Sequence, residues 1–514
     1  MVFTKLTAEQ QKAYDAIKAG HSVFLTGNAG TGKSYVLQKV MQYFHKHKMA
    51  FVASAPTGIA ALNINGVTLH SLLHIRPGII TDGPNYLTIN QWRKMFKDGG
   101  ILIVDEISMC RLDLFELLVK TIKETEDKTK EPIQVIFVGD FYQLPPIVAA
   151  SEQQEYFKHF KGIYAFESPL WQDLNLDNMI LHEEIRQQQT TDREKWFVQA
   201  LNHIRFNDHY ALNAIQYINQ ECYHASLDPK GIFLCGYRRS VDQINSNHLK
   251  DLSGKEVDFH CYSDKTITPG TYPVNQILHL KIGARVMCVK NTKDDNNETI
   301  YNGQQGTVID IIAHGKRLSK SKTNLSANAP GKSVYSAYSH GNHEPLKKCQ
   351  EDNGVLVEFD AMNNSPKTRS WISWDFWQKS RYVIDGGQLK QETIGYFGQI
   401  PLKLAYAITI HKAQGQTIQG SMNLKSEIFA PGQLYVGLSR VKSIDNLHLQ
   451  SPLRPQDAIP NLKVTEFYRS IDPAMQNMQV HYDRNKLLTQ LGQIVQQMPD
   501  NKLAQFINLA NMYK

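Results

Sequence analysis

The sequence predicts an α/β protein with two parallel-sheet domains and a small β-barrel inserted into the second. Three observations lead to this prediction. The first 150 residues alternate short apolar, β-branched runs with helical patterns, as parallel strands with crossover helices do. A second set of the same kind begins near residue 180. Between 304 and 394, short alternating strands flank a stretch without periodicity, which favours a barrel with a long internal loop.

The first α/β region is the easier one to divide into elements. Four apolar runs predict strands at 22–26, 51–54, 101–104 and 134–138. A helix is expected at 33–46, because Val36, Val40 and Phe44 share one face. A second helix is expected where apolar side chains recur at helical spacing, at Phe115, Leu118, Val119 and Ile122.

The second α/β region is interrupted by the barrel. Before the interruption we expect strands at 231–235 and 285–289 and a helix at 240–249. The barrel strands are expected at 306–311, 355–359 and 371–377. The α/β pattern then resumes at 402–410, followed by a helix near 432–438 and a strand at 447–449.

Composition sets limits on function. Among 514 residues the net charge is +7, which permits polyanion binding without requiring it. Residues 311–350 hold seven Lys/Arg and one Glu, as a basic binding loop or a solvated loop would. The six cysteines contain no Cys-x-x-Cys pair, which argues against iron–sulfur, zinc-knuckle and disulfide frameworks and for a reducing compartment. Without an apolar leader or an 18-residue apolar run, we expect a soluble, non-exported protein that does not contact membranes.

Residues 27–34 fit the phosphate-binding pattern G-x-x-x-x-G-K-[ST], with a strand before them and a helix after them. Glycines let backbone N–H groups close around phosphates at the start of a helix. Lys33 would reach the β- and γ-phosphates, and the Ser34 hydroxyl would hold Mg²⁺. The nucleotide-binding residues predicted here are Gly27, Asn28, Ala29, Gly30, Thr31, Gly32, Lys33 and Ser34.

An acidic pair, Asp105-Glu106, follows the apolar strand at 101–104. Parallel sheets bind ligands at the carboxyl ends of their strands, so Asp105 is placed to hold the same Mg²⁺ as Ser34. Glu106 could orient and deprotonate the attacking water. Together with the phosphate loop, this pair predicts hydrolysis of ATP with Mg²⁺.

Further motifs follow in a fixed order. They are LTAEQ at 6–10, APTGIAA at 55–61, GVTLHS at 66–71, DEISM at 105–109, GDFYQLPP at 139–146, RQ at 186–187, ITIHKAQGQT at 408–417 and YVGLSR at 435–440. This series resembles superfamily-one, subgroup-B DNA helicases of the Pif-one type, which are related to RecD-like and Dda-like helicases. The resemblance implies two tandem RecA-like domains, with a small wedge insertion in the first and an SH3-like β-barrel in the second.

The resemblance also implies roles at the nucleotide. Gln10 would read the adenine edge, and Gly415 would lie at the bound nucleotide. Gln143 would sense the γ-phosphate and couple it to DNA. Arg186 and Arg440 would complete the site across the cleft, where an arginine stabilises charge on the transferring phosphoryl group. The catalytic set is therefore Lys33, Asp105, Glu106, Gln143, Arg186 and Arg440.

The DNA contacts implied by the resemblance come from both domains. Their hydroxyls, amides and one cation suit phosphate contacts that position a strand without reading its sequence. The first domain would supply Thr57, Thr68, His70 and Ser71. The second would supply Thr409, His411, Lys412, Gln414 and Thr417.

The expected domains are 1–178 (first RecA-like), 179–303 with 395–455 (second RecA-like), 304–394 (barrel) and 456–514 (a C-terminal helical extension). Residues 72–99 are the expected strand-separating wedge. Its apolar surface would come from Pro77, Tyr86, Trp92 and Phe96, although a packed insertion would show the same residues. Trp371, Trp374 and Trp377 could stack bases, but their spacing favours the barrel core.

The predicted function is an ATP- and Mg²⁺-dependent helicase that moves 5′ to 3′ on single-stranded DNA and unwinds forked duplexes. By resemblance its substrates extend to G-quadruplexes and RNA–DNA hybrids, and its pathways to DNA repair, recombination and telomere maintenance. A monomer is the expected active unit, in the cytoplasm for this compact, bacterial-like form or in the nucleus of a eukaryote. Two alternatives stay open, a RecD-like subunit of a nuclease complex and a non-motor P-loop NTPase switch.

Overall fold

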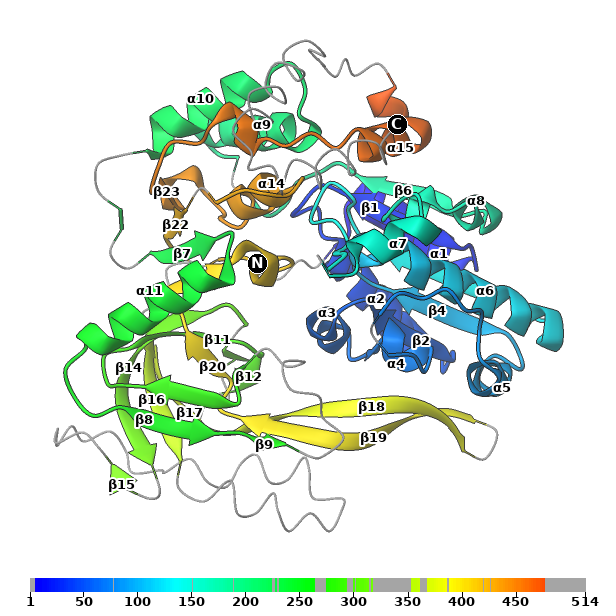
Figure 1. The fold of residues 1–514 in the computed structure, drawn as a ribbon, viewed down its shortest axis with the longest axis horizontal. Coiled ribbons are helices and arrows are strands. Elements are labelled where there is room, and N and C mark those ends of the chain that lie inside the picture. The colour runs from blue at the N-terminus through cyan, green and yellow to red at the C-terminus, as the bar shows by residue number, and fades with distance from the viewer. Residues whose placement is uncertain are drawn as a thin grey trace.

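The computed structural model describes residues 5–476, except 77, 150, 188, 224–226, 229–230, 264–273, 294–298, 301, 314–315, 318–352, 361–367, 386–387, 419 and 426. The basic stretch 314–348 therefore lies outside the described residues, apart from 316–317. Figure 1 shows two α/β lobes side by side, with a mostly β body beneath them.

The first lobe is built on a six-stranded sheet in which every pairing is parallel, in the order β3-β2-β4-β5-β1-β6. The strands are β1 (Val23–Gly27), β2 (Phe51–Ala55), β3 (Val67–Thr68), β4 (Gly100–Val104), β5 (Ile133–Val138) and β6 (Asp177–Leu181). All four strands expected in this region are present. β3 and β6 were not expected, and β6 crosses the expected boundary at 178/179, so this sheet ends only at Leu181.

Helices cover both faces of this sheet, and their ends are set by local sequence. They are α1 (Ala8–Lys18), α2 (Lys33–Lys46), α3 (Gly58–Asn63), α4 (Leu69–Leu72), α5 (Tyr86–Met95), α6 (Leu112–Thr129), α7 (Gln153–His159) and α8 (Leu170–Asp173). A capping box between Thr7 and Gln10 starts α1. The expected apolar face of α6 packs into the core through Phe115, Leu118, Val119 and Ile122.

The expected wedge, 72–99, is only partly exposed. Trp92 and Phe96 are 0% and 1% exposed and belong to the core of the first lobe, so their assignment to a wedge surface is wrong. The Trp92 indole N–H donates to the carbonyl of Leu72, which holds α5 against α4. Tyr86 is 77% exposed at the start of α5, so it remains available. Pro77 lies outside the described residues.

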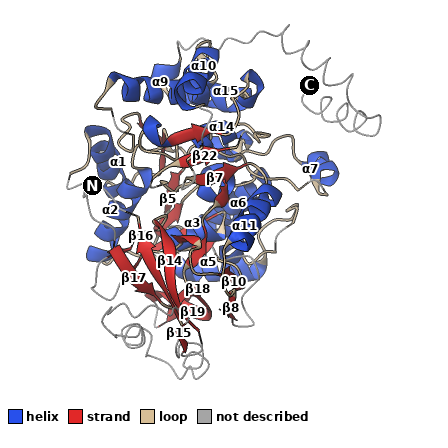
Figure 2. Cartoon of the chain, turned by 90° about the vertical axis from the view of Figure 1, so that its left-hand side faces the viewer, coloured by secondary structure: helices blue, strands red, loops and turns tan. Residues whose placement is uncertain are grey.

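The second lobe has a four-stranded parallel sheet in the order β21-β7-β22-β23. Its strands are β7 (Ile232–Cys235), β21 (Ala407–Thr409), β22 (Met422–Leu424) and β23 (Leu447–Leu449). Its helices are α9 (Asp192–Phe206), α10 (Ala211–Cys222), α11 (Arg238–Asp251), α13 (Ile410–Ala413) and α14 (Gln433–Leu438). The helix expected at 240–249 is α11, and the one expected at 432–438 is α14. Figure 2 shows α9 and α10 at one end of the molecule and the β body at the other.

The β body extends beyond the expected limits 304–394 at both ends. Its main sheet runs β17-β16-β14-β11-β20, and the short strand β15 pairs with the last residues of β14. The strand expected at 285–289 in the second α/β sheet is β11, and it pairs antiparallel with β14 and β20 instead. Its sequence, RVMC, is short, with three apolar residues after Arg285, so it fits either kind of sheet. The strands of this body are β8 (Val257–His260), β9 (Tyr262–Ser263), β10 (Ile277–Leu280), β11 (Arg285–Cys288), β12 (Thr292–Lys293), β13 (Thr299–Ile300), β14 (Gln305–Ala313), β15 (Lys316–Arg317), β16 (Gly354–Phe359), β17 (Thr368–Ile372) and β20 (Leu402–Leu404).

The strand expected at 371–377 is instead the end of one strand and the start of another. β17 ends at Ile372, and β18 (Asp375–Asp385) pairs antiparallel with β19 (Gln388–Gln399) to form a long arm. The arm runs beneath the first lobe (Figure 1) and contacts α4, α5 and β3. Trp374 packs in the core of the β body, and Trp377 packs with Phe397 against Leu62 of α3. Trp374 thus matches the barrel-core alternative, whereas Trp377 is buried in a separate cluster and Trp371 is half-buried.

The chain returns to the first lobe near its C-terminus. Helix α15 (Leu462–Ile471) lies within the expected extension and packs Phe467 against Phe24 and Phe141. The Tyr468 hydroxyl forms a hydrogen bond with the Thr26 hydroxyl at 2.6 Å. The rest of that extension, 477–514, lies outside the described residues.

Two further features bear on expectations about the whole chain. The described cysteines, at 110, 222, 235, 261 and 288, are all free thiols. Within the described ranges, no helix combines the length and the apolar character needed to cross a bilayer.

Candidate active site

The phosphate loop follows β1, which lies between β5 and the edge strand β6 in the first sheet. Gly27 has φ +140°, and a Cβ there would lie 2.1 Å from the carbonyl oxygen of Leu181, so only glycine fits. Gly32 adopts the left-handed conformation directly before α2, whose first residue is Lys33. The Lys33 ammonium donates to the carbonyls of Gly27 and Asn28 at 2.8 and 2.9 Å. The loop thus folds over its own lysine.

Lys33 is half-buried beneath the loop, where its ammonium is partly desolvated. Burial lowers its pKa to about 8, while the negative charges of Asp140 and Glu106 act in the opposite direction. A buried cation of this kind gains from a nearby anion, because opposite charge offsets the lost hydration. The site is therefore electrostatically suited to phosphate.

The acidic pair lies where β4 ends, as the sequence predicts. Burial, followed by the charge of Glu106, raises the pKa of Asp105 to about 7, and burial also raises the pKa of Glu106. Glu106 has φ +52°, and its N–H donates to Oδ1 of Asp105 at 2.9 Å. Two adjacent carboxylates, one buried and one half-buried, are costly without cations. Hard oxygen donors of this type match what Mg²⁺ prefers, so Asp105 with the exposed Ser34 hydroxyl fits that ion.

Gln10 lies against the phosphate loop, and Gln143 lies beside Asp140 and Gly432 of the second lobe. The Gln10 side-chain amide donates to the carbonyl of Thr31 at 2.9 Å and is buried beside Gly32. Gln143 donates weakly to Asp140, at 3.4 Å. A Cβ at Gly432 would lie 2.3 Å from the carbonyl oxygen of Gln143, so the two lobes meet closely there.

Two arginines reach the cleft from beyond the first sheet. One Arg186 amino group donates to the carbonyl of Ser439 at 3.2 Å. Arg440 donates to the carbonyls of Val436, Ala413 and Gln416 and to the Ser439 hydroxyl. Burial lowers the pKa of both, that of Arg440 to about 9. Arg440 is thus committed to its own lobe in this structure.

The second lobe also touches the acidic pair directly. The Gln414 amide donates to Oε2 of Glu106 at 3.2 Å. Gly415 follows, and a Cβ there would lie 3.6 Å from Oε1 of Glu106. Gln414, expected on the DNA side, therefore lies against Glu106 in this structure.

Several contacts at the cleft were not expected from sequence. The N–H of Ala29 donates to the Tyr435 hydroxyl at 2.6 Å, although such loop N–H groups are the ones that phosphates use. The Asn28 amide donates to both Glu184 and Asn202 at 2.8 Å. These contacts tie the loop to α14 and α9. Tyr435 lies inside the quoted YVGLSR motif, but nothing in that motif indicates a loop contact.

A buried ion pair joins the lobes beside the loop. Arg205 of α9 and Asp140, which follows β5, lie 2.9 Å apart and are 6% and 0% exposed. The charge of Asp140 helps to keep Arg205 protonated, and its pKa is raised despite burial. The Tyr468 hydroxyl is 3.4 Å from the same carboxylate. Asp140 was inside the GDFYQLPP motif without a predicted role, and no local signal marked Arg205.

Three of the threonines expected at DNA begin short helices. Thr57, Thr68 and Thr409 directly precede α3, α4 and α13. Each hydroxyl accepts a hydrogen bond from the backbone N–H three residues later. An oxygen that accepts in this way keeps its own proton as a donor. The two lobes thus present the same hydroxyl geometry at the ends of β2, β3 and β21.

The remaining residues expected at DNA lie in different surroundings. Thr409, His411 and Lys412 line a cavity of about 950 Å³ between the lobes and the β body. Burial lowers the pKa of His411 and of His70. Ser71 donates its N–H to Thr68, and Thr417 is half-buried beside Gly303.

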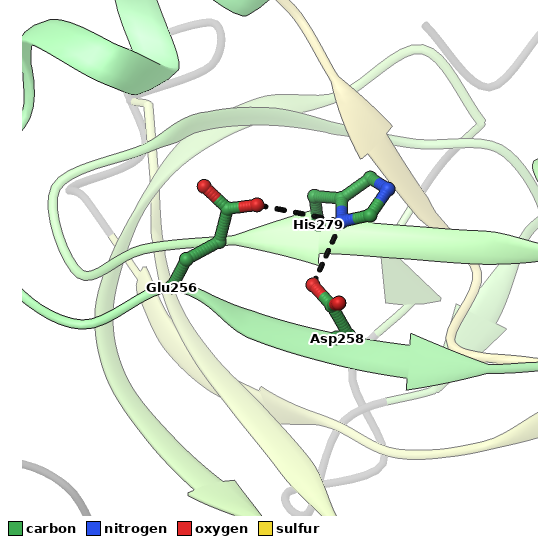
Figure 3. Close-up of side chains that lie close together, drawn as sticks. All are labelled: Glu256, Asp258 and His279. Carbon is green, nitrogen blue, oxygen red and sulfur yellow. Dashed lines mark hydrogen bonds and ion pairs between the residues drawn. The ribbon is translucent and has the colours of Figure 1, made fainter.

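The only metal-type cluster in the described residues away from the cleft is exposed on the β body. His279 of β10 lies opposite Asp258 of β8, with Nδ1 2.7 Å from Asp258 and 3.4 Å from Glu256 (Figure 3). All three side chains face solvent, so the group acts as a cross-strand ion pair.

Comparisons with known proteins agree with this geometry. Residues 5–211 match the family described as PIF1-like helicase. An ATP-dependent DNA helicase Pif1 of Campylobacter jejuni is 30% identical over 473 residues, covering 88% of this chain and 91% of the relative. The crystal structure of Bacteroides sp. Pif1 with ADP-AlF4 has a TM-score of 0.70 at 28% identity, covering 91% of this chain and 97% of that one. A Bacteroides Pif1 complex with ADP-AlF3 and single-stranded DNA has a TM-score of 0.58 at 27% identity, with 91% and 97% covered.

Proposed function

This chain belongs to the PIF1-like helicase family of ATP-dependent DNA helicases, and on that premise we propose that it moves 5′ to 3′ along single-stranded DNA. The observation that carries the proposal is the cleft itself. One lobe supplies a phosphate loop and an acidic pair, and the other contacts both, through Tyr435 and Gln414. A nucleotide bound there would alter how the lobes meet.

The residues of the first lobe perform separate tasks in hydrolysis. Lys33 and the loop N–H groups hold the phosphates, and Glu106 orients the attacking water. Mg²⁺, held by Ser34 and Asp105, would neutralise charge on the β- and γ-phosphate oxygens. Arg186 and Arg440 would stabilise charge that develops on the transferring group.

Because Tyr435 occupies the N–H of Ala29, a phosphate must take that donor from the tyrosine. Arg440 must likewise exchange carbonyl contacts for the phosphate. Both changes act on α14 and its C-terminal end, so occupancy of the cleft is transmitted to the second sheet. Opening and closing then let the two sets of threonine hydroxyls grip the strand alternately.

Strand separation on this scheme needs small steps. Opening one base-pair step costs on average ~1.4 kcal/mol, about tenfold in equilibrium, so single openings can be trapped as they occur. We place the wedge at Tyr86 rather than at the buried aromatics of 72–99. We also propose that the first lobe is the ATPase domain, that the β body is the SH3-like insertion, and that the active unit is a monomer.

The substrates we propose are forked duplexes, with G-quadruplexes and RNA–DNA hybrids as further candidates, in genome maintenance. Such a protein works where the chromosome is, in the cytoplasm of a bacterium or the nucleus of a eukaryote. The proposal is tested with two matched duplexes that differ only in a 5′ or a 3′ single-stranded tail.

Unwinding of the 5′-tailed duplex alone, with ATPase activity stimulated by single-stranded DNA, is the expected result. Preference for the 3′ tail would overturn the polarity. ATPase activity that ignores DNA would instead favour a P-loop switch, and a chain active only with added nuclease subunits would favour the RecD-like alternative.

A further inference from the structure

The channel between the lobes and the β body contains a cation without an acidic partner. Lys403 lies on β20, opposite Met287 of β11. It lines the cavity of about 950 Å³ described above and also a second cavity of about 700 Å³. Lys412 is the other residue shared by both cavities. The two cavities therefore meet at a pair of lysines.

The surroundings of Lys403 do not neutralise it. Burial and the charge of Lys412 both lower its pKa, to about 8, and no carboxylate among the described residues counteracts them. Lys290, which lines the second cavity, differs, because its ammonium lies 2.8 Å from Asp375 and also donates to the carbonyl of Phe376. Lys403 is half-buried and Lys412 is exposed, and a partly buried cation beside another cation is stabilised when an anion joins them. Two cavities of about 950 and 700 Å³ that meet at these lysines have room for a polyanion that passes through both.

The first cavity has a different feature, a stack of three rings. The Tyr237 and Phe429 rings lie 4.9 Å apart at 17°, and Phe429 and His411 lie 6.0 Å apart at 18°. Tyr237 and Phe429 are 40% and 47% exposed, and all three rings line the cavity. The Arg239 guanidinium also lies over the Tyr237 ring, 5.2 Å from its centroid, and this exposed side chain must make room for a base. Aromatic rings accept bases of any sequence, because every base has a π-face.

The same cavity also has an unfavourable end for phosphates. Glu256 and His279 line it, and Asp258 lies beside them (Figure 3). Two carboxylates repel phosphates, whereas the lysine pair attracts them. Arg238, Lys250 and Asp242 also line this cavity, so its charges are mixed, whereas no carboxylate in the described part of the chain opposes Lys403.

We propose that single-stranded DNA stacks a base on the Tyr237–Phe429–His411 rings and continues into the second cavity past Lys403, which binds a backbone phosphate. This rests on the proposed function, since it specifies how the same DNA is held. It adds three residues, Tyr237, Phe429 and Lys403, to those expected from the motifs.

The phosphate contact is tested by measuring the affinity of the full chain for a fluorescent single strand across a range of salt concentrations. Lys403→Met should lower the affinity roughly tenfold and reduce the slope of log K against log salt by about 0.7, one phosphate contact for a single strand. Lys403→Arg should restore the slope. Lys120→Met removes an exposed lysine of α6 that lines neither cavity. It should change neither the affinity nor the salt slope.

The stacking contact is tested with Phe429→Leu and Tyr237→Leu on a strand that contains 2-aminopurine. Each variant should lose roughly 5- to 100-fold in affinity with the salt slope unchanged, and should relieve the quenching of the probe. An unchanged slope in Lys403→Met, or unchanged quenching in both leucine variants, overturns the corresponding contact. A wild-type chain that fails to bind the strand at all would instead overturn the proposed function.

Discussion

The two parallel sheets resemble each other on the side that we assign to DNA and differ on the side that we assign to ATP. Strand β3 of the first sheet and β21 of the second each end in a threonine that caps a short helix, and Thr57, two residues after β2, caps another. Among the described strands of the two sheets, β1 alone leads into the phosphate loop, and acids follow β4 (Asp105) and β5 (Asp140) in the first sheet. The second lobe contributes Arg440, two residues after the end of α14. Strand gripping can therefore be shared equally, whereas hydrolysis cannot.

The strongest test of this asymmetry is Lys33→Ala. Loss of the ammonium removes the cation that faces the phosphates, so hydrolysis should fall by ~10³ or more while single-stranded DNA still binds. Phosphate release with saturating DNA measures it. Lys46→Ala, in the exposed last turn of the same helix, should hydrolyse ATP normally. Sustained ATP hydrolysis in Lys33→Ala would mean that the first sheet does not bind the ATP that is hydrolysed.

The contribution of the second lobe is tested with Arg440→Ala. Turnover should fall by ~10³, with ATP affinity within about tenfold of the original, because the guanidinium acts on charge that develops during transfer. Arg440→Lys, which keeps the charge without the planar fork, should recover only part of the rate. Since Arg440 also holds carbonyls of its own lobe, thermal unfolding serves as a check that the variants fold. Normal turnover in both variants would remove the second lobe from the chemistry.

A smaller effect is expected on stability from Asp105→Asn. The pKa of Asp105 is about 7 in the fold against 3.8 for a free side chain, so ionisation destabilises the folded chain as pH rises between those values. Without nucleotide or metal, the asparagine variant should be more stable at pH 8 by about 1–3 kcal/mol, and the gain should shrink toward pH 4. Urea unfolding at several pH values measures the difference. Exposed Asp127→Asn should show no such trend, and a gain independent of pH would contradict the assignment.

The similarity between the sheets is tested with Thr57→Val and Thr409→Val. Each loses a helix cap, worth about 0.5–2 kcal/mol, and a hydroxyl donor, so each should bind single-stranded DNA a few-fold more weakly. Thr57→Ser and Thr409→Ser keep both features and should bind normally. Fluorescence anisotropy at fixed salt compares the four variants. Weaker DNA binding in only one of the two valine variants would contradict the equal contribution of the two lobes to DNA binding.

Local sequence predicted the parts of the fold whose signals are local. Helix α2 and strand β23 have the bounds expected, because a phosphate loop and a short apolar run define their own limits. Strand β11 was assigned to the wrong sheet, since three apolar residues after an arginine do not specify a partner. Trp92 was assigned to the surface because an aromatic in an insertion looks the same whether it packs or protrudes. The Arg205–Asp140 pair joins residues 65 positions apart, a distance over which no periodicity acts.

The arm formed by β18 and β19 links the β body to the opposite lobe. The body continues the chain of the second lobe, yet its arm lies along α4 and α5 of the first. Eleven residues of β18 extend roughly 36 Å, so a five-degree rotation at the base displaces the far end by about 3 Å. A small change in the angle between the two lobes would therefore move the far end of the arm by several ångströms along α5. A pair of spin labels, one on α5 and one on the arm, would record each turnover as a change in separation.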